Sequence, residues 1–330
     1  MAVHGRSSPR DRLVGRSIAG HPRDCPATIG SMESSSPNRK VLLPGPAVSA
    51  EWLAARLGRP GLVVMDGSWY LPGSGRDPER EFTERRIPGA RFFDIDRCSD
   101  PDAALPHTVA PSDHFRRCAE EAGVSAGSAV VAYDASGVNL SAARVWWNFR
   151  YFGHDNIAVL DGGLRHWVAA GNPTESGAPV RTLEAPAPFV PRPRPHLIRD
   201  FRDVLRATRA EGVQIVDMRP RGRFAGTEPE PRAGLRGGHV PGSRNVPYVD
   251  LVDRATGLAI DFEAFRQLVA EAGIDPANEL VGTCGSGTSA CAFAWLMARA
   301  GKGDVAIYDG SWSEWGGRDD LPIETGPPDD

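Results

Sequence analysis

The stretch LVGTCGSGTSACAFAWLMARAG, residues 280–301, places one cysteine between a short apolar run and a glycine-rich loop. The loop consists of Cys284, Gly285, Ser286, Gly287, Thr288, Ser289 and Ala290, and a helix is expected over residues 291–300. Glycines let the backbone curl so that successive N–H groups point inward, and a following helix adds its own unpaired N–H groups. Such a setting stabilises a thiolate, so we expect Cys284 to act as a nucleophile.

A second set of candidate residues lies in GRFAGTEPEPRAGLRGG, residues 222–238, which contains Arg223 and Arg232. This segment follows a predicted strand ending at Asp217, which we place beside the strand that ends at Cys284. Because the carboxyl ends of parallel strands share one edge of a sheet, both arginines are expected near the thiolate. Arginine binds carboxylates through a bidentate fork, so the pattern favours a carboxylate-bearing substrate.

The chain contains an internal duplication that explains how these residues are positioned. Residues 87–90 (IPGA), 114–134 and 158–167 resemble residues 240–243 (VPGS), 264–284 and 306–315, each about 150 residues later. In the first half Asp134 stands where the second half has Cys284. We therefore expect the second half to be catalytic and the first to be a non-catalytic scaffold.

Each half alternates short apolar strands with helices, which indicates an α/β fold with a mostly parallel sheet covered by helices on both faces. The predicted domains are residues 41–177 and 199–325, joined by a proline-rich extended linker at 178–198. Residues 1–40 are rich in Arg, Ser, Gly and Pro, and are interpreted as a disordered tail or as an organelle targeting segment.

The composition narrows the class of protein. The 330 residues are 41% apolar with a formal net charge of −4, and no apolar run is long enough to span a bilayer, so neither nucleic acid nor a membrane is an expected partner. Five cysteines without CxxC spacing indicate a reducing compartment, hence the cytoplasm, or the mitochondrion if residues 1–40 direct import. The histidines have no metal-ligand spacing: His107, His114, His154 and His166.

Over residues 41–325 the chain resembles the tandem-rhodanese sulfurtransferases. The matching motifs are GRDPEREFTERRIPGARFFDID, SAARVWWNFRYFGH, VLDGGLRHW, GRFAGTEPEPR, CGSGTSAC and YDGSWSEW. The resemblance implies two rhodanese-like domains, of which only the second is catalytic, and no cofactor. It also implies a ping-pong reaction in which Cys284 takes sulfur from a donor as a persulfide and a thiol or cyanide removes it.

The resemblance also implies roles for single residues. Arg223 and Arg232 would hold the donor's carboxylate and ketone, residues 285–290 would supply backbone N–H groups, and Ser286 would handle a proton. Asp77 lies in a region that reaches across the domain interface in this family. Arg86 stands where the family usually has a histidine proposed to work with the loop serine, so that His–Ser relay is not expected here.

The donor predicted from the loop is 3-mercaptopyruvate, which would leave as pyruvate. Family members that prefer thiosulfate resemble CRKGVT, whereas this chain has Gly285 and Ser286 at the two cationic positions. One such charge pair at 4 Å is worth roughly 4 kcal/mol at an effective dielectric constant of ~20, so a dianionic donor loses most. Thioredoxin, small thiols and cyanide are all chemically able to accept the sulfur.

Three alternatives share parts of this pattern. A thiosulfate:cyanide sulfurtransferase would use the same cysteine with the other donor. A cysteine phosphatase of similar fold needs an arginine at the end of the loop, where this chain has Ala290 and Cys291. A sulfur-relay or binding module would take up sulfur without turning over.

Overall fold

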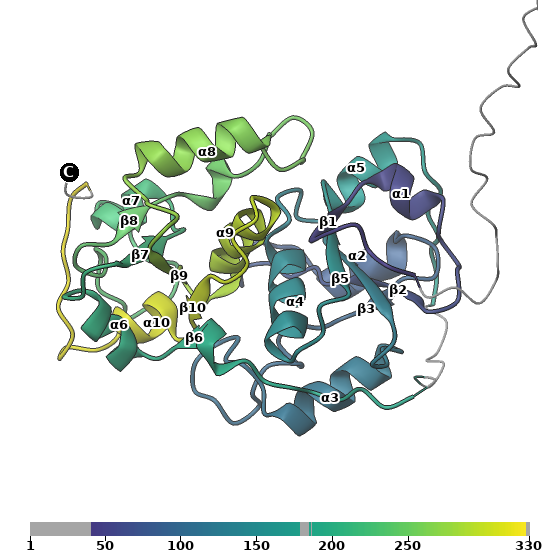
Figure 1. Cartoon of the computed structure of the whole chain (residues 1–330), viewed down its shortest axis with the longest axis horizontal. Helices are drawn as coiled ribbons and strands as arrows, with labels where there is room; N and C mark the ends of the chain where they lie inside the picture. Colours follow the sequence, from purple (N-terminus) through teal and green to yellow (C-terminus); the bar gives the residue numbers. More distant parts are fainter. Residues whose placement is uncertain (1–40, 179–184, 186, 328–330) are drawn as a thin grey trace, which may run out of the picture. The chain divides into compact units, whose positions relative to one another are not determined.

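The structure of the chain is a computed structural model that describes residues 41–178, 185 and 187–327. The predicted tail at residues 1–40 and part of the predicted linker lie outside the described residues. Two five-stranded sheets dominate the described part, one in each half of the duplicated sequence (Figure 1). Within the predicted linker, Pro195–Leu197 forms the short 3-10 helix η1, and β6 begins at Ile198.

The two sheets have the same topology, and all their strand pairs are parallel. The first has the order β1-β5-β4-β2-β3, with β1 Ala47–Val48, β2 Leu62–Asp66, β3 Arg91–Phe92, β4 Ala129–Tyr133 and β5 Ile157–Leu160. The second has the order β6-β10-β9-β7-β8, with β6 Ile198–Arg199, β7 Val213–Asp217, β8 Arg244–Asn245, β9 Glu279–Thr283 and β10 Ala306–Tyr308. The predicted parallel α/β fold and the internal duplication are confirmed.

Helices cover both faces of each sheet. In the first half these are α1 Ala50–Ala54, α2 Pro78–Glu84, α3 Ser112–Glu121, α4 Leu140–Tyr151 and α5 Gly163–Ala169. In the second half they are α6 Phe201–Ala207, α7 Arg221–Ala225, η2 Tyr248–Asp250, α8 Phe262–Glu271, α9 Thr288–Arg299 and α10 Ser311–Trp315. Apolar side chains of α3, α4, α8 and α9 share one core, whereas α1, α2 and α5 pack on a second core and α6 and α10 on a third.

Helices α4 and α9 pack against each other and join the two halves (Figure 1). Both helices are buried along most of their length, including Trp146 and Trp147 of α4 and Trp295 of α9. These three tryptophans therefore serve packing, and Trp167, Trp312 and Trp315 are fully buried as well. The first domain is therefore fixed to the helix that follows the loop of residues 284–287 through one continuous core.

One local prediction differs from the structure. Helix α9 begins at Thr288, three residues earlier than expected, because Gly287 adopts φ +77° and the helix starts directly after it. In α8, Phe262 lies on the same apolar stripe as Phe265 and Val269 but is 60% exposed, whereas those two residues are buried. No helix in the described ranges has the length and apolar character needed to cross a bilayer.

Candidate active site

Cys284 directly follows β9 and lies at the carboxyl edge of the second sheet. Asp217, the last residue of β7, pairs in register with Thr283, so the two strands end side by side as predicted. The cysteine residue is only 2% exposed. Because α9 begins at Thr288, residues 288–290 form its first turn and bring unpaired backbone N–H groups to the loop.

Helix α10 holds the peptide units on both sides of the cysteine. The backbone N–H of Trp312 donates to the carbonyl of Cys284 at 2.9 Å, and the N–H of Ser313 donates to the carbonyl of Gly285 at 2.9 Å. The N–H of Cys284 in turn donates to Oγ of Ser311 at 3.3 Å. Ser311 is buried and has φ +49°, a strained conformation for a residue with a side chain. The motif YDGSWSEW, to which the sequence assigned no role, therefore positions Cys284.

Two guanidinium groups converge on the residue after the nucleophile. A Cβ atom built at Gly285 would lie 3.3 Å from Nη2 of Arg223 and 3.6 Å from Nη1 of Arg232. Arg223 comes from α7, and Arg232 comes from the loop that follows this helix. The structure thus brings together the loop and both arginines, as the sequence predicted.

The two arginines differ in their partners. Arg223 donates through Nε to Oε2 of Glu230 at 3.0 Å, and its Nη2 also contacts that oxygen. Glu230 is buried and also pairs at 2.7 Å with Arg219, which pairs at 2.7 Å with buried Asp217. This buried network of two carboxylates and two guanidinium groups fixes Arg223 beside the loop.

Arg232 is half-buried and makes no hydrogen bond or ion pair with the residues that the structure describes. Its burial lowers the pKa of the guanidinium, and the negative charge of a Cys284 thiolate opposes that effect. A cation with no carboxylate partner beside a nucleophile is suited to bind an incoming anion. Arg232 is therefore the best candidate for direct contact with a substrate carboxylate.

His107 of the first domain completes the site and was missed by the sequence analysis. Its Nδ1 lies 2.9 Å from Oγ of Ser286 and 3.0 Å from Oγ1 of Thr288. Its Nε2 lies 3.0 Å from Oδ1 of Asp96, at the distance of an ion pair but without the alignment of a good hydrogen bond. The structure thus pairs the loop serine with a histidine from elsewhere in the chain, whereas Arg86 stands where the family usually has one.

The surroundings of His107 hold it in a defined orientation. The residue is 3% exposed and has φ +63°, a strained value for a non-glycine residue. The ring of Trp69 meets it edge-on with centroids 4.6 Å apart, and Nε1 of Trp69 donates to Oδ2 of Asp96 at 2.9 Å. The close contact with the His107 ring lowers the pKa of the Asp96 carboxyl. Asp96 therefore stays ionised and faces the ring nitrogen opposite Ser286.

Arg144 connects this histidine to the second domain. Its side chain is fully buried in α4 and donates from Nη2 to the carbonyl of His107 at 2.5 Å and to Oδ1 of Asp309 at 3.0 Å. Nη1 reaches the carbonyl of Gly287 in the loop at 3.4 Å. Oδ2 of Asp309 accepts the N–H of Val109 at 2.7 Å. One guanidinium thus links the segment that carries His107 to the loop that carries Ser286.

The structure places Asp77 and Arg86 away from this site. Asp77 is the N-cap of α2 and accepts the N–H of Arg80 at 3.0 Å. Arg86 is 2% exposed and pairs with Glu175 at 2.8 Å inside the first domain. Neither residue has a hydrogen bond or ion pair to the second domain among the described residues, so their predicted interface contribution has no support in the geometry.

The first domain shows how a loop of this kind behaves without a cysteine. The carboxylate of Asp134 accepts the backbone N–H groups of Ser136 at 2.9 Å and Ala142 at 3.0 Å. The hydroxyl of Ser141 also donates to it at 3.2 Å. The loop therefore carries a built-in anion where the second domain has a sulfur. No group of three or more possible ligands is placed to hold a metal ion in either domain, within the described ranges.

The comparisons with known proteins agree with this geometry. The family model of the rhodanese-like domain matches residues 49–170 and 201–318. The human 3-mercaptopyruvate sulfurtransferase is 47% identical over 274 residues, which cover 81% of this chain and 91% of that protein. The mouse thiosulfate sulfurtransferase is 40% identical and is covered to 93%, with 84% of this chain. The solved structure of SseA, a 3-mercaptopyruvate sulfotransferase from Escherichia coli, is similar with a TM-score of 0.73 at 32% identity, covering 82% of this chain and all of SseA.

Proposed function

This chain belongs to the rhodanese-like family, and we propose that it transfers the sulfur of 3-mercaptopyruvate to a thiol or cyanide acceptor. The observation that carries the proposal is the convergence of Arg223 and Arg232 on Gly285, directly beside Cys284. A 2-oxo acid that carries a thiol presents the two features this site can use, a carboxylate for an arginine and a sulfur for a thiolate.

The reaction begins when the donor carboxylate binds Arg232. The thiolate of Cys284 attacks the donor sulfur, a sulfur–sulfur bond forms, and the carbon–sulfur bond of the donor breaks. The electron pair of that bond passes to the carbon beside the ketone and gives the enolate of pyruvate. Arg223 and Arg232, positioned over Gly285, stabilise the charge that develops on the ketone oxygen.

The proton of the donor thiol is accepted by a group of three side chains, those of Ser286, His107 and Asp96. The Ser286 hydroxyl lies 2.9 Å from Nδ1 of His107, so the proton can pass through the hydroxyl to the imidazole. The Asp96 carboxylate stabilises the imidazolium that results. Return of the proton to the enolate carbon gives pyruvate, and an acceptor thiolate then attacks the outer sulfur of the persulfide and regenerates Cys284.

The loop geometry favours 3-mercaptopyruvate over thiosulfate. A side chain at Gly285 would meet both guanidinium groups, so an arginine there would add a third cation to a space already occupied by two. Ser286 is engaged with His107 and could not become a lysine without losing that contact.

Thioredoxin and small thiols are the acceptors we propose. A cytoplasmic location stays a prediction because residues 1–40 lie outside the described range.

The mass of the intact protein after mixing with 3-mercaptopyruvate tests the proposed chemistry. We expect a gain of one sulfur atom that is absent in Cys284→Ser and retained in Cys291→Ser, because Cys291 is buried beneath the loop. A subsequent excess of thiol should restore the original mass and permit repeated turnovers. Sulfur uptake by Cys284→Ser would contradict the assignment, and uptake without repeated turnover would favour the sulfur-relay alternative.

A further inference from the structure

The first domain contains a counterpart of Arg223, although Asp134 stands where the second domain has Cys284. Arg76 follows Gly75 as Arg223 follows Gly222. Arg76 donates from Nε and Nη2 to the two carboxylate oxygens of Glu81 at 2.9 and 2.6 Å, which reproduces the pairing of Arg223 with Glu230. The duplicated half therefore retains an arginine that is fixed by its own carboxylate.

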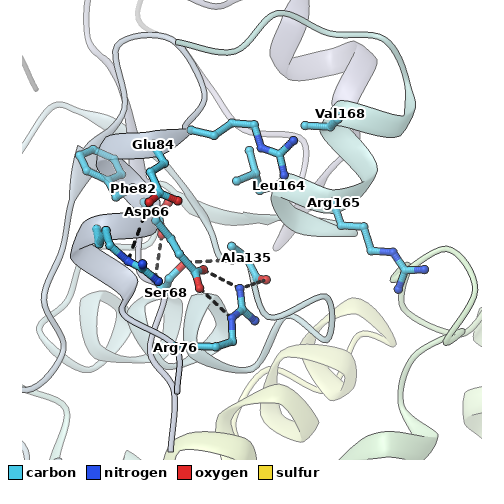
Figure 2. A pocket seen from close by; sticks show the side chains of 12 residues that line it. Asp66, Ser68, Arg76, Phe82, Glu84, Ala135, Leu164, Arg165 and Val168 are labelled. Carbon is cyan, nitrogen blue, oxygen red and sulfur yellow. Dashed lines mark hydrogen bonds and ion pairs between the residues drawn. The ribbon is translucent and has the colours of Figure 1, made fainter. Parts of the chain in front are cut away.

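The position of this arginine relative to the loop is also retained. Nη2 of Arg76 donates to the carbonyl of Ala135 at 3.2 Å, and Ala135 directly follows Asp134. In the second domain Arg223 lies over Gly285, which directly follows Cys284. Figure 2 shows Arg76 beside Ala135 at one end of a pocket in the first domain. Both domains thus place a guanidinium beside the first loop residue at the carboxyl edge of their sheet.

A cavity of about 640 Å³ opens at this place. Its volume falls in the range of roughly 300 to 1,000 Å³ that is typical of small-molecule sites. Arg76 and Asp66 line one part, and the apolar side chains of Leu164 and Val168 of α5 line another (Figure 2). The second domain's active-site edge thus has a counterpart in the first domain, large enough for a small organic molecule.

The charges around the cavity define the kind of ligand. Four arginines and three carboxylates line it: Arg76, Arg80, Arg85, Arg165, Asp66, Glu81 and Glu84. Glu81 pairs with Arg76, and Glu84 lies 3.8 Å from Arg80. Arg165 donates to the backbone carbonyls of residues 254 and 255. Arg85 has no side-chain hydrogen bond or ion pair among the described residues, so the cavity has one cation in excess.

The loop itself cannot supply further donors to an anion. The buried carboxylate of Asp134 accepts the N–H groups of Ser136 and Ala142, and the N–H groups of Ala135 and Val138 donate to serine hydroxyls. A ligand anion must therefore bind the arginines, and no nucleophile is present at the loop position to react with it. Binding at this site would be reversible and would leave the ligand chemically unchanged.

We propose that this cavity is a reversible binding site for a small 2-oxo monocarboxylate, the chemical class of the donor and product in the active site. Two observations support the existence of the site: the pairing of Arg76 with Glu81 beside the loop, and the one arginine in excess of the carboxylates. The class of ligand rests on the proposed function. Arg85 and Arg76 bind the carboxylate, and the apolar wall formed by Leu164 and Val168 contacts the carbon chain.

Equilibrium dialysis of the full chain with radiolabelled pyruvate tests the proposal. Pyruvate has no transferable sulfur, so binding is measured without turnover. We expect two sites per chain in the wild type and one in Arg232→Gln. In Arg232→Gln/Arg85→Gln the remaining site should weaken by about tenfold, as for the loss of one charge-assisted hydrogen bond. Arg232→Gln/Arg76→Gln should weaken it at least as much.

The matched control is Arg232→Gln/Arg59→Gln, because Arg59 is an exposed arginine of the same domain that does not line the cavity. It should leave the remaining site unchanged. The proposal is overturned if Arg232→Gln binds no pyruvate, if Arg85→Gln has no effect on the remaining site, or if Arg59→Gln weakens it equally.

The single variant Arg85→Gln distinguishes this proposal from the proposed function. It should form the Cys284 persulfide and turn over 3-mercaptopyruvate at the wild-type rate, because Arg85 does not contact the catalytic loop. A loss of turnover in this variant would contradict the independence of the two sites. If the wild-type enzyme is fully active but binds only one pyruvate, the proposal of a second site is overturned and the proposed function stands. If the chain binds two pyruvates but forms no persulfide, only the proposed sulfur transfer is overturned.

Discussion

At the scale of single residues, the chemistry depends on how two domains bring His107 and Ser286 together. The hydroxyl and the imidazole come from opposite halves of the duplication, yet lie 2.9 Å apart. The strained backbone of His107 and its contacts with Trp69 and Asp96 show that this orientation is held firmly. A proton relay built this way requires both domains, although only one carries the nucleophile.

Replacement of His107 by asparagine should lower kcat for 3-mercaptopyruvate by about 100- to 10,000-fold near neutral pH, the usual contribution of a positioned base. KM should change little, because the arginines that bind the donor are untouched. Part of the loss should be recovered at higher pH, where the donor thiol ionises without help. Thr288→Val, which removes the second hydroxyl on Nδ1, serves as the milder comparison. An unchanged pH–rate profile in His107→Asn would rule the relay out.

The donor preference is tested at residues 285 and 286. The wild type should show a higher kcat/KM for 3-mercaptopyruvate than for thiosulfate. In Gly285→Arg/Ser286→Lys the ratio should move toward thiosulfate by at least about tenfold, because two added cations favour a dianion. Activity with 3-mercaptopyruvate should fall at the same time, since Ser286 no longer contacts His107. Equal values of kcat/KM for the two donors in the wild type would contradict the proposed donor.

The sequence predicted the nucleophile and its arginines but not the histidine. Cys284, Arg223 and Arg232 follow strand ends, and parallel strands bring such residues to one edge whatever the details of the loops. His107 lies in an irregular segment, 179 positions away from Ser286 in the sequence. Spacing tests for metal ligands cannot detect such a pair, because an irregular segment leaves the direction of its side chains open.

At the scale of secondary structure, the loop and the relay are aligned by the contact between α4 and α9. Arg144 of α4 bonds to the carbonyls of His107 and Gly287 and to Asp309, so one side chain spans the interface of the two domains. The Arg144 side chain is completely buried and pairs with one carboxylate, that of Asp309. A side chain of another shape at this position would therefore disturb the bonds that align the loop and His107.

Arg144→Lys should keep the charge but lose the planar fork that makes these bonds together. We expect kcat to fall by roughly 10- to 100-fold, in line with small misplacements of catalytic groups, while KM stays near the wild-type value. The persulfide should still form when the reaction is allowed enough time, which separates misalignment from loss of the nucleophile. Unchanged kcat in a folded Arg144→Lys enzyme would contradict the positioning role.

The longer elements were predictable, and the shortest were not. Strands such as Glu279–Thr283 and helices such as Phe262–Glu271 carry enough residues to show a hydrophobic pattern. The edge strands β1, β3, β6 and β8 have two residues each, too few for any pattern. Phe262 fitted the apolar stripe of its helix but lies in the first turn, where the neighbouring core does not reach it.

At the scale of the whole described molecule, each half extends a segment that contacts the loop of the other half. The first domain sends the segment with His107 to the loop of the second. The second domain sends residues 253–259 to the loop of the first, where the carbonyl of Gly257 accepts from Nδ2 of Asn139 at 3.3 Å. Each loop is thus held in part by a residue of the other domain.

Global stability should depend on the protonation of Asp66, a buried carboxyl at the end of β2. Burial raises its pKa from 3.8 to about 6, so the folded state holds a proton that the unfolded state releases. The resulting stabilisation is present below pH 4 and is lost as the pH rises through 6.

Asp66→Asn should therefore gain stability relative to the wild type as the pH rises from 4 to 7, reaching about 3 kcal/mol, the equivalent of roughly two pKa units. Urea unfolding of both proteins at pH 4 and pH 7.5 measures the difference. Ser68→Ala, which keeps the carboxyl and the backbone N–H bonded to it, is the control for loss of local contacts. A difference in unfolding free energy that is independent of pH would show that Asp66 is ionised throughout.

The carboxylate of Asp134 has a further consequence for how duplicated enzymes diverge. Because the carboxylate of Asp134 accepts the N–H groups of Ser136 and Ala142, a copy without a cysteine keeps the hydrogen bonds that hold its loop. The domain without the cysteine can then serve to stabilise the structure of the other domain. Loss of chemistry and loss of architecture are thereby uncoupled in this molecule.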